Sequence, residues 1–302
     1  MKLIEPSVEI LSQEIGLLGV YKQIEKAGKV CYQSTHSISE NSATPFVRRL
    51  IESRHYAPLE HGTVYLTIPD YKTSGREEFY ALVDFFNKNP YSISYIDEHD
   101  GDKYLYITTN YRVLLENQMH GLLEFITEPS EYHSARVTAR FICDRAIAQE
   151  LTRHRKFSFC MESTRFNNYS KDKFNNELIY IMPQWLDIRG QIAVTKETFN
   201  EVIKETFSNF LYSKDAEVFI QQLLDAEDSY LKLIEEGWKP EQARNILPLA
   251  TKCELYMTGF VSDWQDFFNQ RCSFLAKTGK PHPQAAELAD KLYKLFEEKH
   301  LL

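Results

Sequence analysis

Short stretches of alternating polar and apolar residues interrupt a sequence that is otherwise helical in pattern. Side chains alternate between the two faces of a strand, whereas an amphipathic helix repeats its apolar positions every three to four residues. The alternating stretches predict strands over residues 63–69, 103–109, 134–141, 178–182 and 253–260. The helical patterns predict helices over residues 17–32, 77–87, 111–126, 143–153, 196–212, 216–236, 240–247 and 284–299. Ser262 is expected to cap one more helix, which carries Trp264, Phe267 and Phe268 as core residues. The mixture predicts an α+β protein with a central, mostly antiparallel sheet and helices packed on it.

The charge balance limits the ligands that the chain can bind. The formal net charge is −8, so the protein as a whole repels nucleic acid, and we expect no nucleic-acid partner. An anionic ligand therefore needs a local cluster of Arg or Lys. The sequence contains neither a GxGxxG motif nor a P-loop, which excludes the common glycine-rich phosphate sites.

Cysteine usage and hydrophobicity predict the compartment. The five cysteines are scattered and form no CxxC pair, which is typical of a reducing environment rather than of a disulfide framework or a structural zinc site. Residues 1–16 contain acids where a signal peptide needs an apolar run. No stretch approaches the roughly 20 apolar residues of a membrane span. We therefore expect a cytoplasmic protein with no membrane partner.

The densest polar cluster is RHRKFSFCMESTRF, residues 153–166. Successive residues on a helix point about 100° apart, so Arg153, His154 and Arg155 at a helix end would face different directions and could bind more than one anion. The guanidinium fork of Arg suits phosphate. For the RHR triplet alone, a solvated basic helix end is the competing interpretation.

The longer pattern resembles the signature of the flavin-dependent thymidylate synthases. In that family RHR is followed by seven residues and a Ser, here Ser163, and Arg165 matches the family's S-x-R. The segment HYAPLEH, residues 55–61, resembles the family's H-E-[ST]-P-x-E-H, and residues 235–249 resemble its G-x-x-x-E-x-A-R-x-x-L-P. Arg271 and His282 are spaced like an Arg and a His near the family's C-terminus.

The resemblance covers roughly residues 15–69 and 134–299. It implies a single domain over residues 1–302, in which residues 70–133 form an insertion relative to compact members of the family.

The resemblance also implies roles for individual residues. Arg271 would face the uracil ring, favour its ionised form and act in catalysis. The residues expected against FAD are Arg153, His154, Arg155, His55, Glu60 and Asp266. The residues expected against dUMP are Glu150, Arg153, Glu162, Ser163, Thr164, Arg165, Arg244 and Arg271.

Some positions depart from the family pattern. Met161 stands before Glu162 where Asn or Gln is usual, so the Glu is either shifted in register or specific to a subgroup of the family. Ala57 replaces a Ser or Thr, and Phe260, Ser262 and Asp266 stand where Asn, Arg and Asn often contact the cofactor. A metal site at His55 and His61 lacks the three or four ligands that it needs. Ser163 as a nucleophile would need a positioned base, and the resemblance implies chemistry without a protein nucleophile, so a contact to the phosphate or sugar is favoured.

The function that the resemblance implies is FAD-dependent methylation of dUMP to dTMP. Methylenetetrahydrofolate would donate the one-carbon unit, NADPH would reduce the flavin, and the protein would be a homotetramer whose sites combine several chains. Two alternatives stay open at this point. One is a sibling enzyme that hydroxymethylates dUMP, and the other is a non-catalytic uridine-nucleotide-binding protein on the same scaffold.

Overall fold

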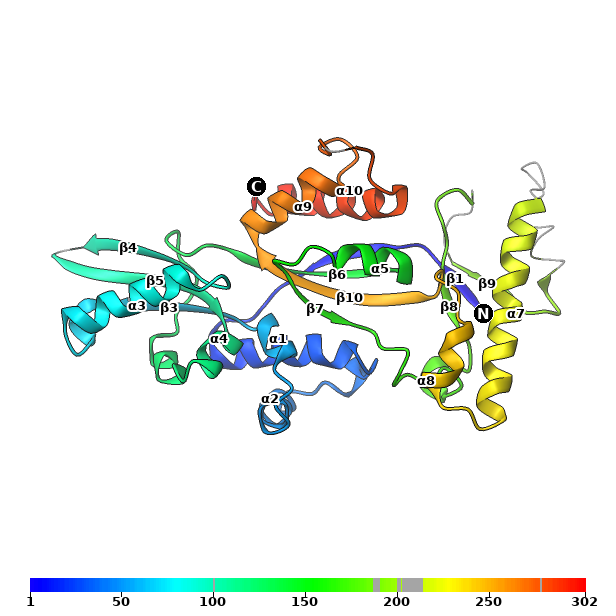
Figure 1. Cartoon of the computed structure of the whole chain (residues 1–302), viewed down its shortest axis with the longest axis horizontal. Helices are drawn as coiled ribbons and strands as arrows, with labels where there is room; N and C mark the ends of the chain where they lie inside the picture. The colour runs from blue at the N-terminus through cyan, green and yellow to red at the C-terminus, as the bar shows by residue number, and fades with distance from the viewer. Residues whose placement is uncertain (100, 187–190, 200–201, 203–213, 278) are drawn as a thin grey trace.

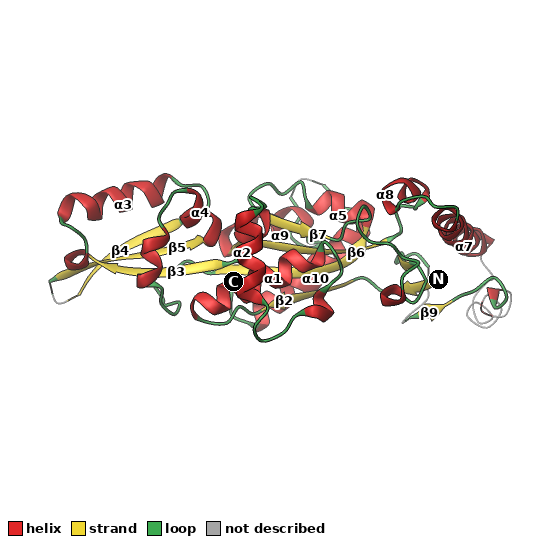
Figure 2. Ribbon diagram, turned by 90° about the horizontal axis from the view of Figure 1, so that it is seen from below, coloured by secondary structure: helices red, strands yellow, loops and turns green. Residues whose placement is uncertain are grey.

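The computed structural model describes residues 1–302 except for residues 100, 187–190, 200–201, 203–213 and 278. In this part of the chain three small sheets follow one another along the long axis of the molecule (Figure 1). Helices cover their faces, as Figure 2 shows from below. The predicted α+β class with antiparallel sheets is confirmed.

The central sheet carries the residues of the predicted signature. Its strand order is β2-β6-β10-β7, and every neighbouring pair is antiparallel. The strands are β2 (Ser7–Leu11), β6 (Arg136–Asp144), β10 (Lys252–Phe260) and β7 (Ser158–Met161). The pairing of β6 with β10 extends over nine residues, from Arg136 opposite Phe260 to Asp144 opposite Lys252. This ladder is the longest one in the central sheet.

Three helices cover one face of the central sheet, namely α5 (Arg145–Leu151), α9 (Val261–Arg271) and α10 (Pro283–Glu298). Trp264, Phe267 and Phe268 of α9 are completely buried, which confirms them as core residues. Trp264 also donates a hydrogen bond from its indole nitrogen to the carbonyl oxygen of Val137, at 3.2 Å.

Helix α1 (Gly16–Val30) covers the opposite face of the central sheet and packs against α2 (Ala43–Glu52). Ala27 and Val30 of α1 form a buried cluster with Cys160 of β7 and Tyr256 of β10. The central sheet is therefore the middle layer between two helical layers.

The other two sheets extend the molecule at its two ends. One contains β3 (Thr63–Pro69), β5 (Asp102–Asn110) and β4 (Ile93–His99), with α3 (Arg76–Lys88) packed through Phe79 and Phe86. Most of it comes from residues 70–133, whose origin as an insertion stays a prediction. The other contains β8 (Ile179–Ile181), β1 (Lys2–Ile4) and β9 (Ile192–Ala193), and packs against α7 (Lys214–Glu235). No helix among the described residues is long and apolar enough to span a membrane.

Several predicted element boundaries need correction. The helix predicted over residues 111–126 is divided into α4 (Tyr111–Glu116) and a 3₁₀ turn at His120–Phe125. The helix predicted over residues 240–247 ends as α8 (Pro240–Ala243), and Arg244–Ile246 form a 3₁₀ turn. Ser262 is not a cap, because α9 begins at Val261 and the Asp263 carboxylate accepts the amide hydrogen of Phe260. The helix predicted over residues 196–212 lies largely outside the described residues.

The strand predicted to end at residue 141 continues to Asp144, whose side chain then begins α5. Its Oδ1 accepts the amide hydrogen of Ile147 at 2.8 Å, and its Oδ2 accepts a hydrogen bond from the buried side chain of Gln284 at 2.9 Å. A helix leaves its first amide groups without partners in the helix, and an N-cap carboxylate supplies one.

We expect Asp144→Ala to lower the free energy of unfolding by about 1–2 kcal/mol, the usual cost of losing an N-cap acceptor. The matched control Asp144→Asn keeps an acceptor at the cap and is expected to retain most of the stability. Urea unfolding followed by circular dichroism measures both variants. Equal stability of Asp144→Ala and the unmodified protein would show that the cap does not stabilise α5.

Candidate functional site

The signature residues lie on both sides of β7. Arg153, His154 and Arg155 form the turn that follows α5, β7 takes up residues 158–161, and Ser163 lies two residues beyond the strand. The cationic triplet and the Ser163 segment are therefore separated by a strand, which the polar appearance of this segment did not predict.

Two helices meet at the cationic triplet. Because β6 and β10 are antiparallel, α5 and α9 start from opposite ends of this pair of strands. Both pack on the same face of the sheet, so their C-terminal ends approach one another. The contact is made by Glu150 in the last turn of α5 and Arg271 at the end of α9, whose carboxylate and guanidinium are 2.7 Å apart. A helix C-terminus carries partial negative charge, so cations at this meeting point stabilise both helices.

The guanidinium of Arg271 makes three contacts, and all of them are to predicted site residues. Its Nη1 donates to Oε2 of Glu150 at 2.7 Å, its Nε donates to Nε2 of His154 at 3.0 Å, and its Nη2 donates to the carbonyl oxygen of Glu150 at 3.4 Å. The side chain of Arg271 is 16% exposed. A guanidinium has five N–H donors, so two remain for a ligand.

His154 is a neutral hydrogen-bond acceptor in this cluster. Its Nε2 accepts the hydrogen bond from Arg271, which leaves the imidazole proton on Nδ1. Its ring packs edge-on against Phe267, with 5.0 Å between the ring centroids. Burial lowers the pKa of His154 to about 4, and the positive charges of Arg271 and Arg153 act in the same direction. His154 therefore orients Arg271 without adding a positive charge of its own.

Arg153 and Arg155 are exposed, and neither forms an ion pair with any residue that the structure describes. Asp266, which was also predicted near the cofactor, instead forms an ion pair with Lys156 at 2.9 Å. Lys156 also lies 3.6 Å from Asp263. The triplet consequently presents two free guanidinium groups beside the Arg271 cluster.

Backbone contacts hold the Ser163 segment against the end of α1. The amide of Ser163 donates to the carbonyl oxygen of Cys31 at 3.1 Å, and its Oγ accepts the amide hydrogen of Arg165 at 3.2 Å. Thr164 is buried. Arg165 forms an exposed ion pair with Glu241 of α8 at 3.1 Å. Arg244 follows Glu241 by three residues and is exposed, so the structure brings the predicted phosphate contacts Arg165 and Arg244 to one surface.

Glu162 forms a buried network with protein groups. Its Oε2 pairs with Nζ of Lys252 at 2.8 Å and accepts the amide hydrogen of Glu254, while its Oε1 accepts a hydrogen bond from Tyr169 at 3.1 Å. Burial raises the pKa of Tyr169, and the neighbouring Glu162 adds to the effect, so this phenol stays a donor. A cavity of about 280 Å³, lined partly by Glu162, Lys252, Lys173 and Lys2, lies beside this network. Lys252 was missed in the sequence, because nothing local marks a cation that pairs with a residue 90 positions away.

The His55–His61 segment packs against β7 through the 3₁₀ turn Ala57–His61. His55 is exposed, whereas the carboxylate of Glu60 pairs with Arg112 at 2.6 Å. His61 is completely buried and contacts Oγ1 of Thr258 at 2.7 Å, and burial lowers its pKa to about 3. No group of residues that could hold a metal ion is present in the described part of the chain. The segment therefore lies beside the signature strand, and its role towards a flavin stays a prediction.

The depressed pKa of His154 predicts how stability depends on pH. Below pH 6.5 the imidazole takes up a proton in the unfolded chain but not in the folded one, so stability falls as the pH drops from 6.5 towards about 4. The slope from this residue is at most about 1.4 kcal/mol per pH unit. His154→Gln keeps an acceptor for Arg271 but does not titrate, and we expect a shallower slope from urea unfolding at pH 7, 6 and 5. Identical slopes for the two proteins would contradict a neutral, buried His154.

Comparison with known proteins agrees with the resemblance in the signature. The model of the family described as thymidylate synthase complementing protein matches residues 109–300. A flavin-dependent thymidylate synthase of Synechocystis sp. is 27% identical over 157 residues, which are 52% of this chain and 65% of that protein. A probable flavin-dependent thymidylate synthase of Paramecium bursaria Chlorella virus 1 is 26% identical over 166 residues, which are 52% of this chain and 70% of that protein.

A solved structure, the UMP/dUMP methylase PolB from Streptomyces cacaoi bound with 5-Br dUMP, aligns with a TM-score of 0.43 and 15% identity. That alignment covers 99% of this chain and 93% of the other. The parts of this chain that match the two flavin-dependent thymidylate synthases span about two thirds of the length of those proteins. The predicted family is confirmed: because the family model covers more than half of the chain, the protein belongs to the thymidylate synthase complementing protein family.

Proposed function

We propose that the protein is a flavin-dependent thymidylate synthase that methylates dUMP to dTMP. FAD is the cofactor, methylenetetrahydrofolate is the one-carbon donor and NADPH is the reductant. Membership of the family supports the reaction class. The observation that carries the proposal is the contact of Arg271 with both Glu150 and His154, because it joins the end of α9 to the signature turn that follows α5.

The residues at the signature turn suit a flavin dinucleotide. FAD contains a diphosphate, and the free guanidinium groups of Arg153 and Arg155 match phosphate oxygens in two-point fashion. The 3₁₀ turn with Glu60 lies on the neighbouring strand β7, and His55 is exposed beside it. FAD supplies the hydride chemistry when it is bound, while the protein orients the reactants and sets the charge around them.

Arg271 is the residue that we assign to catalysis. Attack by uracil C5 on a one-carbon donor draws electron density from N3 and the carbonyl oxygens. A fixed guanidinium at that edge of the ring stabilises the negative charge as it develops. Glu150 and His154 hold the Arg271 fork in place and leave two N–H donors free for the base.

The Ser163 segment is assigned to the phosphate and sugar of dUMP, through Ser163, Thr164, Arg165 and Arg244. Both side chains of the Arg165–Glu241 ion pair are exposed to solvent, and exposed ion pairs contribute little to stability. A phosphate can therefore replace Glu241 as the partner of Arg165 at small cost. Glu162, also assigned to dUMP, would act from its buried position by holding this segment.

Experiments with purified protein test the proposal directly. We expect flavin absorption bands after reconstitution with FAD, and formation of dTMP from dUMP with methylenetetrahydrofolate and NADPH. Mass spectrometry of the product separates a methyl from a hydroxymethyl group. Binding of dUMP without any bound flavin would contradict the proposal and favour a nucleotide-binding protein.

We expect Arg271→Ala to lower kcat by about 10²–10³, the usual cost of removing one preorganised donor, while FAD stays bound. Arg271→Lys keeps the charge but not the fork, so it should recover only part of the rate. The exposed Arg48→Ala on α2 is the matched control and should be neutral. Steady-state rates at saturating dUMP, with flavin content measured by absorbance, decide the matter. A wild-type rate for Arg271→Ala would make Arg271 structural.

The site is proposed to be completed by other chains in a homotetramer. Large apolar side chains are exposed beside three of the assigned segments: Phe166 after Arg165, Leu249 after Arg244 and Phe274 after Arg271. We assign these three side chains to contacts between subunits. We expect light scattering to give the mass of four chains of 35.4 kDa. Leu249→Asp should lower both the mass and the activity, and a fully active monomer would contradict the assembly.

A further inference from the structure

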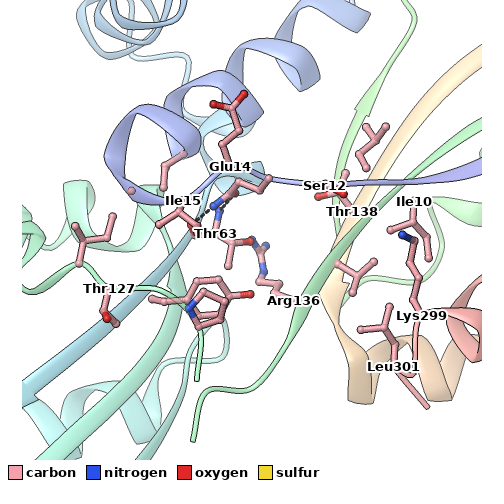
Figure 3. A pocket seen from close by; sticks show the side chains of 18 residues that line it. Ile10, Ser12, Glu14, Ile15, Thr63, Thr127, Arg136, Thr138, Lys299 and Leu301 are labelled. Carbon is pink, nitrogen blue, oxygen red and sulfur yellow. Dashed lines mark hydrogen bonds between the residues drawn. The ribbon is translucent and has the colours of Figure 1, made fainter. Parts of the chain in front are cut away.

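A cavity of about 460 Å³ is lined by none of the residues assigned above (Figure 3). The end of β2, the start of α1, the starts of β3 and β6, and residues 299 and 301 form its walls. Its volume is that of a pocket for a small organic molecule.

The wall of this cavity contains a partly buried cation, Arg136, which has no carboxylate partner within 4.0 Å among the described residues. Arg136 donates from Nη1 to the carbonyl oxygen of Glu60 at 2.8 Å and to Oγ1 of Thr63 at 3.3 Å, and from Nη2 to Oγ of Ser158 at 3.3 Å. All three acceptors are uncharged, and none of the described carboxylates lies within 4.0 Å of this guanidinium. Burial lowers the pKa of Arg136 to about 10, so it remains a cation at neutral pH. The carboxylates of Glu60 and Asp263 act on this charge without contacting it, so an anion in the cavity would be its direct charged partner.

The first turn of α1 points to an anion independently. The helix has 15 residues and begins at Gly16 on the cavity wall, where Ile15 occupies the N-cap without a side-chain acceptor and the first turn contains no acid. In the described part of the chain, the amides of Gly16, Leu17 and Leu18 donate to no side chain and no loop carbonyl. Such amides and the helix dipole favour negative charge.

The other charged groups at the cavity agree with this sign. Lys299 lines the cavity as a second cation. Glu14 is the acid on the wall, but it forms an ion pair with Lys22 at 2.6 Å, and its carboxylate points away from Arg136 in Figure 3. Arg136 and the first turn of α1 therefore form a cationic end of the cavity, whereas Lys299 lies beside Ile10 and Leu301 in Figure 3. The carboxylate on the wall, Glu14, is already paired.

The rest of the wall is mixed, and its apolar part is formed by Ile10, Leu11, Val20, Ile126, Val137 and Leu301. Ile15 is 61% exposed at the same wall. From the cationic end and this apolar wall we infer that the cavity binds a small organic acid, whose carboxylate lies between Arg136 and the first turn of α1 and whose apolar body fills the rest. The inference does not depend on the proposed enzyme activity. None of the residues assigned to dUMP or flavin lines the cavity, and Glu60 is reached only through its backbone contact with Arg136.

Calorimetric titration of the full chain with decanoate and with 1-decanol tests the chemistry of the ligand. Both have the same apolar body, and only decanoate has the charge. We expect decanoate to bind at least about tenfold more tightly, since hydrogen bonds to a charged group are stronger than those to a neutral one. Equal binding of the two compounds, or no binding of decanoate, overturns the inference.

Substitutions at Ile15 test the location. In Ile15→Asp a carboxylate occupies the amides of the first turn, so decanoate binding should weaken about tenfold or more, while the new cap supports the helix. Ile15→Asn caps the helix without charge and should weaken binding less. Val218→Asp makes the same kind of change at a 56% exposed position on α7 and should have no effect. Arg136→Gln should also weaken binding, and the melting temperature reports whether this variant folds.

Competition separates this cavity from the proposed active site. Decanoate binding should be unchanged by saturating dUMP and FAD, whether or not the protein makes dTMP. Displacement of decanoate by either compound would assign the cavity to the nucleotide or flavin site and overturn the inference of a separate one. Equal loss in Ile15→Asp and Val218→Asp would also overturn it, because binding would then depend on surface charge in general.

Discussion

The nine-residue pairing of β6 with β10 determines where the assigned catalytic group lies. Each strand leads directly into a helix, α5 after Asp144 and α9 after Phe260, and the antiparallel register makes these helices start at opposite ends of the pair. Helices of seven and eleven residues are together about 27 Å long at 1.5 Å per residue, close to the length of the nine-residue strands beneath them. Their C-termini therefore meet, so the negative ends of both helix dipoles lie close together. The cations Arg271, Arg153 and Arg155 lie where that field favours them, which gives the RHR turn a structural reason beside its proposed chemistry.

A second buried interaction holds the other half of the signature. Glu162 lies between Lys252, the amide of Glu254 and the hydroxyl of Tyr169, and its own amide donates to Glu254 at 2.8 Å. Removing one member of such a pair leaves a buried charge uncompensated, which is far more costly than losing an exposed pair. Arg165, three residues later, has an exposed ion-pair partner, Glu241. The segment is thus held in place at Glu162, while the guanidinium of Arg165 is free to change partners. This arrangement suits a phosphate that binds and is released.

Local patterns in the sequence predicted the elements whose side chains alternate or repeat clearly. Strand β3 was predicted with its observed bounds, and α3 and β10 to within a residue, since burial on one face leaves a regular pattern. Strand β7 was missed, because Ser158 is polar yet buried as an acceptor for Arg136, and the cationic triplet just before it reads as a solvated turn. The contact of Glu150 with Arg271 spans 121 positions, so only the family resemblance could place the two together. The register of β6 with β10, which creates that contact, has no local signal in either strand.

Arg136 connects the separate cavity to both elements of the proposed flavin side. One guanidinium nitrogen contacts the backbone of Glu60 and the side chain of Thr63, and the other contacts Ser158 at the start of β7. An anion bound in the cavity would share the same guanidinium through the two N–H donors that remain, beside the hydrogen bonds that hold the Ala57–His61 turn and the signature strand. The coupling between the two places must be reciprocal, since an effect of the acid on flavin affinity implies an equal effect of flavin on acid affinity. The competition with FAD described above measures that coupling. If FAD leaves the affinity for decanoate unchanged, Arg136 has only a structural role between the two places. If FAD changes that affinity without displacing decanoate, Arg136 couples two sites that are occupied together.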